Sequence, residues 1–482
     1  MEVASPSPPA TVAPSPHDHR LSVISMTVLL GVLTAVALTA SSPTQPLLRY
    51  RGGAKQLRLQ KETACETMPS VNCGDGMLLA AAPPAAAPAK NAKPEVALQI
   101  TAFLFVLSVA SMALAPMPHL IAALGDKKAV SISSYVLSMA AAAEIALSPI
   151  MGGLSDSVGR KPALLGTMGC ALVANSAAAL SPTVPLVLLS KFVSSIVAGT
   201  FFLNGGAFLA DNYRNTPKKL AAASGVLFAL VNLGFCLGML LSAAPFMPSS
   251  LRGKYAASAG LCAIGLVFAI GGIRESLPVE DRVPFKARSF NPFAFVRLLS
   301  ISPRMRSLAI LTALASAPMF MGDVLQVFAI QKWQLSMAEL GKLFGGVALS
   351  GVLANICGGP LIRVLGIRRF NMLASLCSMV FWAGFASASL KAAVVCAVIG
   401  FLGQARTLSV TTMLTSEGAK LGIPQGELSG DRANMNAWLK IIGPLIYGQL
   451  AAHGSTIGAP TAPFVLNMLL ALTSAVLGGV VL

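Results

Sequence analysis

The feature that most constrains this chain is a succession of long apolar runs, twelve of which follow one another from Val96 onward. Each run is long enough for a helix to cross roughly 30 Å of membrane hydrocarbon, which takes about 20 residues. Inside lipid every backbone polar group must be paired within the protein, so only helices or a closed barrel can span it. The runs are continuous and lack the alternation typical of barrel strands, and we therefore predict helices.

The runs fall into two sets of six, separated by a polar stretch at 274–306. The first set predicts spans near 96–124, 131–151, 162–181, 184–210, 219–245 and 254–273. The second set predicts spans near 307–330, 338–361, 370–389, 391–415, 431–452 and 463–482. The expected fold is an all-α membrane protein with twelve transmembrane helices in two six-helix halves, residues 93–273 and 307–482, joined by a central loop at 274–306 on the cytoplasmic side.

Composition agrees with this fold and explains the strong positive charge. Only 11% of the 482 residues are charged and 55% are hydrophobic, which is too little polar surface for a soluble domain. The net charge of +17 arises largely in loops that follow even-numbered spans, as at Arg160, Lys161, Arg368 and Arg369. By the positive-inside rule these loops share the cytoplasmic face or its equivalent in an organelle. The charge therefore sets topology, and no nucleic-acid partner is expected.

Residues 1–92 form an N-terminal extension of different character. A Pro- and Ser-rich start, typical of disorder, precedes a hydrophobic segment at 21–40 and a basic, acid-poor segment at 47–61. This order resembles the two-part targeting peptides of algae with secondary plastids, which implies a plastid membrane. The alternative is a retained membrane anchor with a basic flank, which would give thirteen spans.

A distinctive motif, residues 152–161, follows the second span. Gly152 allows close helix approach, Gly159 permits a tight turn, and Asp156 can pair with a cation or a helix N-terminus. The motif resembles the loop signature of the major facilitator superfamily, in which this loop latches the two halves together in one state of the transport cycle. The matching positions are Gly152, Leu154, Asp156, Gly159, Arg160 and Lys161. Ser157 stands where the family carries a cation, and the alternative is a purely topological basic loop.

The second half repeats this motif in weaker form. Five positions recur 207 residues later, at Gly359, Leu361, Arg363, Gly366 and Arg368. An echo at matching helix positions predicts two homologous, pseudo-symmetric halves; the major facilitator fold is itself a standard example of such repeats.

Other stretches resemble the drug–proton antiporter branch, the tetracycline-efflux type. They are 207–211, 275–278, 291–293 and 443–445, and the resemblance spans about 95–482. Met239 replaces the proline of the fifth-span antiporter signature, and Lys191 stands where the branch has arginine. The resemblance implies a monomeric secondary transporter that moves a small organic solute across the lipid bilayer by alternating access, with protons as the candidate coupling ion.

Ionisable residues within spans each cost about 3 kcal/mol to insert and are therefore candidate functional residues. Two carboxylates, Glu144 and Asp323, are candidate proton sites. Three cations, Lys191, Arg406 and Lys440, could attract an anionic solute, and their excess favours an organic anion or zwitterion. The polar residues that complete the candidate pathway are Gln326 and Asn434.

Each of these residues also has a structural interpretation. Asp323 could neutralise Arg406 or Lys440, and Glu144 could pair with Lys191. Polar side chains such as Gln326 could equally bond helix to helix. The departures in the fifth span leave open a second class of function, a transporter-like receptor or scaffold without transport activity.

An enzyme is not expected, because the sequence has no nucleophile elbow and no phosphate loop at a membrane face. The 8 cysteines lie mostly in apolar runs without the spacing of metal ligands. We therefore expect no metal, no cofactor and no disulfide framework.

Overall fold

Helices make up nearly all the regular structure of this protein. The computed structural model describes residues 94–481 except 214–216, 283, 286–290 and 424, and no strand occurs in these ranges. The predicted N-terminal extension, with its hydrophobic segment at 21–40, lies outside the described residues.

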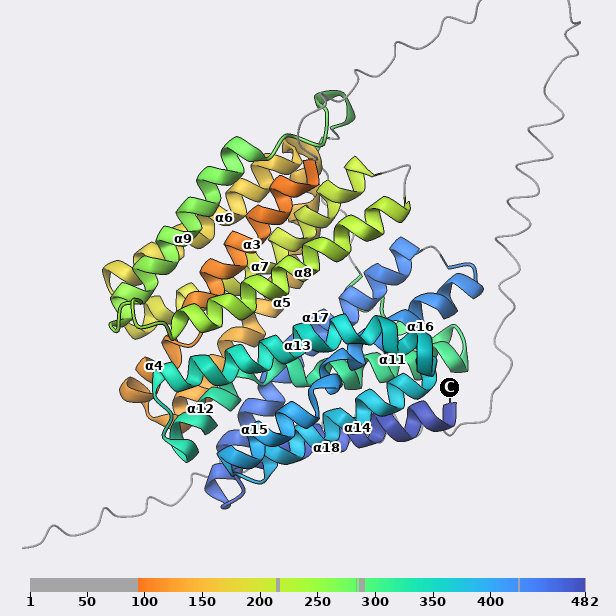
Figure 1. Ribbon diagram of the computed structural model, residues 1–482. Helices are drawn as coiled ribbons and strands as arrows, with labels where there is room; N and C mark the ends of the chain where they lie inside the picture. Colours follow the sequence, from red (N-terminus) through yellow and green to blue (C-terminus); the bar gives the residue numbers. More distant parts are fainter. Residues whose placement is uncertain (1–93, 214–216, 283, 286–290, 424, 482) are drawn as a thin grey trace, which may run out of the picture. The chain divides into compact units, whose positions relative to one another are not determined.

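The first half contains seven helices that make six spans (Figure 1). Helices α3 and α4 together form the first span, which is interrupted just before Pro116. The helices are α3 (Pro94–Met112), α4 (Pro116–Leu124), α5 (Asp126–Val158), α6 (Arg160–Leu180), α7 (Val184–Asn212), α8 (Pro217–Ser242) and α9 (Leu251–Gly272).

The central loop carries two short elements, η1 (Val279–Asp281) and α10 (Val296–Ser300). In the second half, two spans are bent, by 43° between α11 and α12 and by 61° between α15 and α16. The elements are α11 (Pro303–Ser316), η2 (Ala317–Phe320), α12 (Gly322–Trp333), α13 (Met337–Leu365), α14 (Ile367–Ala386), α15 (Leu390–Ile399), η3 (Phe401–Ala405), α16 (Arg406–Lys420), α17 (Gln425–Thr456) and α18 (Ala462–Val481).

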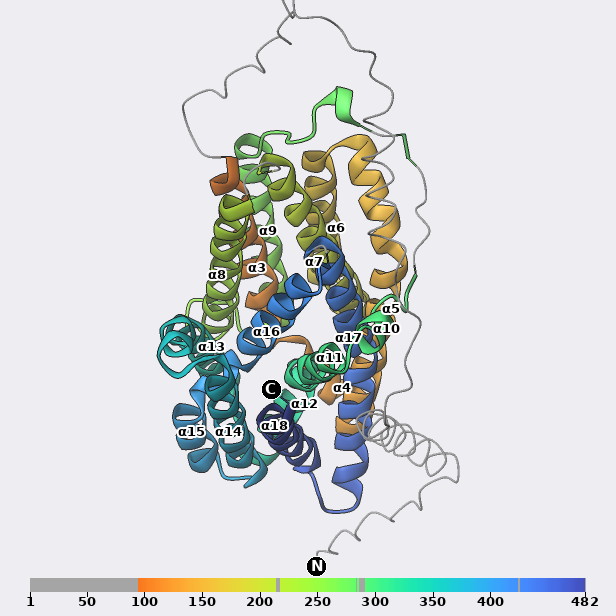
Figure 2. The same cartoon turned by 90° about the vertical axis from the view of Figure 1, so that its right-hand side faces the viewer.

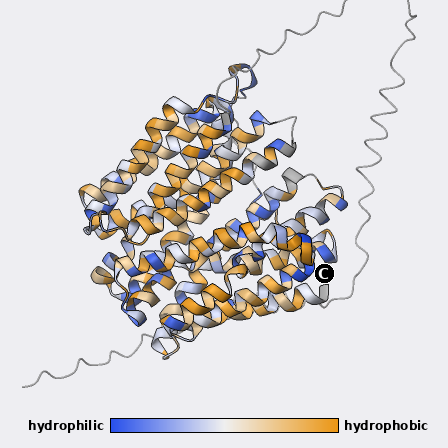
Figure 3. Cartoon of the chain, in the orientation of Figure 1, coloured by the Kyte–Doolittle hydropathy of each residue, from blue (hydrophilic) through white to orange (hydrophobic). Residues whose placement is uncertain are grey.

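Each of the twelve predicted spans coincides with a helix or a bent helix pair. Among the described residues, eight helices are long and apolar enough to cross a membrane, and ten if each bent pair counts as one span. The other two predicted spans correspond to α14 and α17, which do not meet this criterion; α17 carries Asp431 and Lys440. Apolar residues dominate the helices in Figure 3. The prediction of an all-α membrane fold is confirmed.

The two halves repeat local features that the sequence echo predicted. Helices α5 and α13 both end at a glycine with positive φ, 116° at Gly159 and 77° at Gly366, a region in which other residues are strained. The first and seventh spans are both interrupted near a proline, Pro116 and Pro318, which cannot donate a helical hydrogen bond. The pseudo-symmetry therefore extends to the positions at which helices bend and end.

The halves meet along two helix pairs, α5 with α17 and α8 with α13 (Figures 1 and 2). We call the end that carries residues 152–161 the inner end and the opposite end the outer end. Lys127 at the outer start of α5 donates to the Thr456 hydroxyl at 3.1 Å. On the other side, the buried thiol of Cys236 on α8 donates to the Gly345 carbonyl on α13 at 3.6 Å. Cys236 therefore marks the outer contact between the halves.

Candidate functional site

Among the described residues, two ion pairs join the halves, and together they contain four of the five charged residues predicted within the spans. The outer pair consists of Lys191 on α7 and Asp323 on α12, with 2.5 Å between Nζ and Oδ2. The inner pair consists of Glu144 on α5 and Lys440 on α17. Each pair therefore places one charge on the first half and the opposite charge on the second.

A serine completes the outer pair. The Ser133 hydroxyl on α5 accepts from Lys191 Nζ at 2.8 Å and donates to Asp323 Oδ2 at 2.5 Å. The three residues join α5, α7 and α12. Both charged side chains are 15% exposed, so the charges are largely removed from solvent and each depends on the other.

The inner pair lies deeper along the same helix. Glu144 is about 16 Å from Ser133 along α5, or about three turns, so both face the same side of the helix. The side chains of Glu144 and Lys440 are 19% and 30% exposed, more than those of the outer pair. Between the two levels, the Ser138 hydroxyl donates to the Ile441 carbonyl at 2.7 Å, which holds α5 against α17.

The pairings expected from the sequence were wrong in both cases. Asp323 pairs with Lys191 rather than with Arg406 or Lys440, and Glu144 pairs with Lys440 rather than with Lys191. The physical reason is the packing of α5 along α17, which places Glu144 opposite Lys440, while α12 packs against α4 and α5, where Lys191 of α7 reaches Asp323.

Arg406 has a different environment from the other charged residues. It is 2% exposed and donates from one guanidinium nitrogen to the carbonyls of Leu314 and Ala315 at 3.0 and 3.3 Å. These carbonyls belong to the last turn of α11, and Pro318, four residues after Leu314, has no N–H to donate to the Leu314 carbonyl. The other terminal nitrogen of Arg406 has no hydrogen-bond partner among the described residues. Arg406 therefore stabilises the bend of the seventh span.

The two predicted polar residues are both buried. Gln326 on α12 is 5% exposed and Asn434 on α17 is 8% exposed. The Asn434 Oδ1 atom has no partner among the described residues. Within the same part of the chain, no three His, Cys, Asp or Glu side chains are close enough to hold a metal ion.

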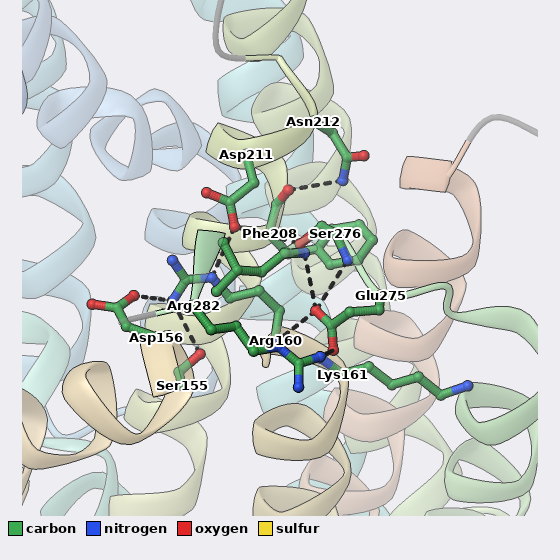
Figure 4. A network of polar contacts seen from close by, with 11 residues as sticks. Ser155, Asp156, Arg160, Lys161, Phe208, Asp211, Asn212, Glu275, Ser276 and Arg282 are labelled. Carbon is green, nitrogen blue, oxygen red and sulfur yellow. Dashed lines mark hydrogen bonds and ion pairs between the residues drawn. The ribbon is translucent and has the colours of Figure 1, made fainter. Parts of the chain in front are cut away.

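The predicted latch motif, residues 152–161, forms a polar network at the inner end (Figure 4). Arg160 is its centre: the guanidinium lies 2.8 Å from Asp211 Oδ2 and 2.7 Å from Asp156 Oδ1, and donates to Ser155 Oγ at 3.1 Å. Lys161 donates to the Ile270 carbonyl at 2.7 Å. Arg160 and Lys161 thus connect α5, α6, α7 and α9 within the first half.

The central loop returns to this network through Glu275. Its carboxylate accepts from the backbone N–H groups of Arg160 and Lys161 at 2.8 and 3.2 Å, at the N-terminus of α6, where a negative charge is favourable. It also lies 3.8 Å from Arg282. A Cβ at Gly159 would overlap this carboxylate, which is a second reason, besides φ, for glycine at this turn.

Sequence reasoning missed four residues of these sites. Asp211 and Glu275 lie in the stretches that resemble the antiporter branch, but their pairing with the motif gives no sequence signal. Ser133 is one of several serines in its span. Gly199 on α7, which gives Glu144 its space, resembles any other glycine of a membrane helix.

Replacing Glu275 with alanine is expected to destabilise the first half by about 1–2 kcal/mol, because two N–H groups at the start of α6 lose their acceptor. Thermal unfolding of the purified protein in detergent measures the change. Glu280→Ala, an exposed acid of the same loop, is the matched control. Equal melting temperatures for the two variants would show that the Glu275 contacts contribute nothing.

Comparison with known proteins agrees with this architecture. The model of the Major Facilitator Superfamily matches residues 98–424. The class C tetracycline resistance protein of Escherichia coli is 25% identical over 344 residues, covering 68% of this chain and 82% of that protein. The human major facilitator superfamily domain-containing protein 10 is 25% identical over 236 residues, covering 45% of this chain and half of that protein.

Solved structures share the fold at lower identity. The human organic anion transporter MFSD10 superposes with a TM-score of 0.57 at 20% identity, covering 80% of this chain and 100% of that one. A bacterial homolog of the human lysosomal transporter Spinster, inward-facing and unoccupied, gives 0.62 at 13% identity, covering 80% and 96%. The family match covers more than half of the chain, so this protein belongs to the Major Facilitator Superfamily, a family of transporters and not of enzymes.

Proposed function

We propose that this protein moves a small organic solute by alternating access, as a monomer, with the two cross-half ion pairs as the elements that form and break during the cycle. The observation that carries this proposal is the placement of opposite charges on opposite halves in both pairs. If the halves rock about a central site, such contacts cannot persist in both states. The ion pairs are therefore suited to make the equilibrium between the states depend on charge.

We assign the present conformation to the state that is closed at the outer end and open at the inner end. The contacts described between the halves run from Lys127–Thr456 at the outer end to Glu144–Lys440 near the middle of α5. The α8–α13 contact also joins outer ends, as at Cys236 and Gly345. At the inner end, by contrast, Arg160 and Lys161 bond within the first half.

The latch motif fits the same cycle. Asp156 and Arg160 form an ion pair with each other in this conformation, and Arg160 also binds Asp211. When the inner end closes, the loop 152–161 would approach the inner ends of the second-half helices. We propose that it then latches the halves, as the family resemblance implies.

Protons are the proposed coupling ion. A proton on Glu144 or Asp323 removes the negative charge of one pair, so its lysine no longer holds the opposite half by Coulomb attraction. Proton binding therefore favours separation at the outer end. Proton release on re-closure restores the pairs, which makes the cycle sensitive to a pH gradient.

An organic anion or zwitterion is the proposed solute class. When a carboxylate of a pair is protonated, Lys191 or Lys440 is left with a charge that an anionic group of the solute can satisfy. The related human MFSD10 is named as an organic anion transporter, which supports this choice. Proton and anion binding at one pair favour each other in this scheme, which gives co-transport. Antiport, as the resemblance to the drug–proton antiporter branch implies, instead requires a cationic group of the solute, such as that of a zwitterion, to compete with the proton for the carboxylate.

Reconstituted full-length protein should accumulate a solute in proteoliposomes only when a pH gradient is imposed. One pH unit supports up to about tenfold accumulation at one proton per solute, since 1.4 kcal/mol is a factor of ten. The measurement is uptake from a panel of organic anions, sugars and cationic drugs. Glu144→Gln and Asp323→Asn are expected to remove the gradient dependence.

The solute panel and the two variants test the solute class and the proton coupling separately. Movement of cationic drugs alone would contradict the anion assignment and leave transport intact. Unchanged pH dependence in both variants would contradict proton coupling through these carboxylates.

A plastid membrane is the proposed location, on the strength of the extension alone. A fluorescent fusion of residues 1–92 in an algal cell with secondary plastids tests it. Targeting to any other membrane would contradict the proposal.

A further inference from the structure

A backbone position on α7 determines where the carboxylate of the inner pair lies. Gly199 has no side chain, and a Cβ placed there would overlap Oε1 and Cδ of Glu144 and lie 2.9 Å from Oε2. The carboxylate therefore occupies the space in which any other residue of α7 would carry its side chain. From this position Glu144 reaches Lys440 on the opposite half.

The contact at Gly199 differs in its partner from the tight contacts at Gly400 and Gly403, which lie against backbone. A Cβ at Gly403 would meet the backbone nitrogen of Ser378 at 2.5 Å, and one at Gly400 would meet the Phe381 nitrogen at 2.8 Å. Those neighbours are backbone atoms, which cannot move without disturbing a helix. The partner of Gly199 is the end of a flexible side chain, which can rotate away. Alanine at 199 would thus leave the fold intact but displace the carboxylate from Lys440.

The same helix provides an internal reference. Gly206 lies seven residues further along α7, about two turns on and on the same side of the helix. A Cβ at Gly206 would meet nothing within 4 Å. Alanine at either position makes the same change in helix propensity, but only alanine at 199 meets Glu144.

We infer that Gly199 is a positioning residue for the transport cycle. Because position 199 has no side chain, the Glu144 carboxylate occupies that space and reaches from the first half to Lys440. This inference rests on the proposed role of the inner pair in the cycle. A residue without a functional group thus controls whether the two charges meet. A shorter acid at position 144 is therefore expected to compensate for a larger residue at position 199.

The test uses Cys236 as a native reporter of the outer contact. Full-length protein in lipid is treated with a membrane-impermeant maleimide from the outer side, and modification of the Cys236 peptide is followed by mass spectrometry. Gly199→Ala should raise the rate several-fold, towards that of Glu144→Gln, while Gly206→Ala should match the wild type. Combining Gly199→Ala with Glu144→Asp, whose side chain is about 1.5 Å shorter, should return the rate towards that of Glu144→Asp alone.

The outcomes separate this inference from the function on which it rests. If Glu144→Gln raises the rate and Gly199→Ala behaves like Gly206→Ala, Gly199 does not position the carboxylate. If Gly199→Ala raises the rate but the shorter acid gives no recovery, the effect arises from helix packing and the inference is overturned. If Glu144→Gln itself leaves Cys236 protected, the proposed role of the inner pair fails, and the inference fails with it.

Discussion

Replacing Asp323 with asparagine should shift the protein strongly towards the outer-open state. Asparagine has nearly the shape of the aspartate but no charge, so Lys191 is left as an uncompensated cation in a site that is only 15% exposed. Removing one partner of such a buried pair costs about 3 kcal/mol, which corresponds to roughly a hundredfold change in the ratio of the two states. Lys191 can escape this cost only if the outer ends separate and admit water.

The labelling rate of Cys236 measures this shift, because the thiol is 2% exposed at the outer contact and becomes accessible when α8 leaves α13. The exposed Asp281→Asn makes the same chemical change in the central loop and should leave the rate unchanged. The double variant Lys191→Met with Asp323→Asn removes both charges and should lie between the wild type and Asp323→Asn, because it relieves the uncompensated cation but not the lost attraction across the pair. A double variant as reactive as Asp323→Asn would contradict the argument from the uncompensated charge of Lys191, whereas a protected Asp323→Asn would show that the pair does not report on the state at all.

The helical architecture could be predicted from the sequence because its determinants are local. An apolar run of sufficient length predicts each span. Glycines such as Gly159 and Gly366, whose positive φ favours glycine, indicate the turns. The interruptions of the first and seventh spans also have a local cause, in Pro116 and Pro318. Membrane insertion strengthens these signals, since lipid leaves few alternatives to a helix for an apolar run.

The site could be predicted only as a set of residues and not as an arrangement. The high cost of a charge in lipid identified Glu144, Lys191, Asp323 and Lys440, but which charges pair depends on how two separately folded halves are aligned. Glu144 and Lys440 are 296 positions apart, and no local pattern encodes that alignment. For Arg406 the sequence predicted a charged partner, but the structure provides backbone carbonyls. The cost of inserting its charge is offset by hydrogen bonds to the carbonyls of Leu314 and Ala315, which the pattern of charged residues does not indicate.

Replacing Arg160 with alanine should give the largest loss of stability among substitutions at the inner end. The guanidinium is 10% exposed and holds two carboxylates, those of Asp156 and Asp211, at 2.7 and 2.8 Å. Without Arg160, the Asp211 carboxylate keeps only the Ser276 hydroxyl at 3.4 Å among the contacts described for it. Asp211 then loses its ion pair and lies across the α5–α7 contact from the like charge of Asp156, and the expected cost is about 3 kcal/mol.

Thermal unfolding in detergent, with size-exclusion chromatography to confirm the folded fraction, measures this loss. Arg160→Lys should fall between the wild type and alanine, because an ammonium keeps the charge but cannot reach both carboxylates with the planar fork of a guanidinium. Arg369→Ala, an exposed arginine in the corresponding loop of the second half, should be close to neutral. A similar loss at Arg369 would mean that positive charge at the inner end, rather than the network around Arg160, stabilises the fold. A neutral Arg160→Ala would mean that the network has no structural role, and that any effect on transport arises in the state in which the inner end is closed.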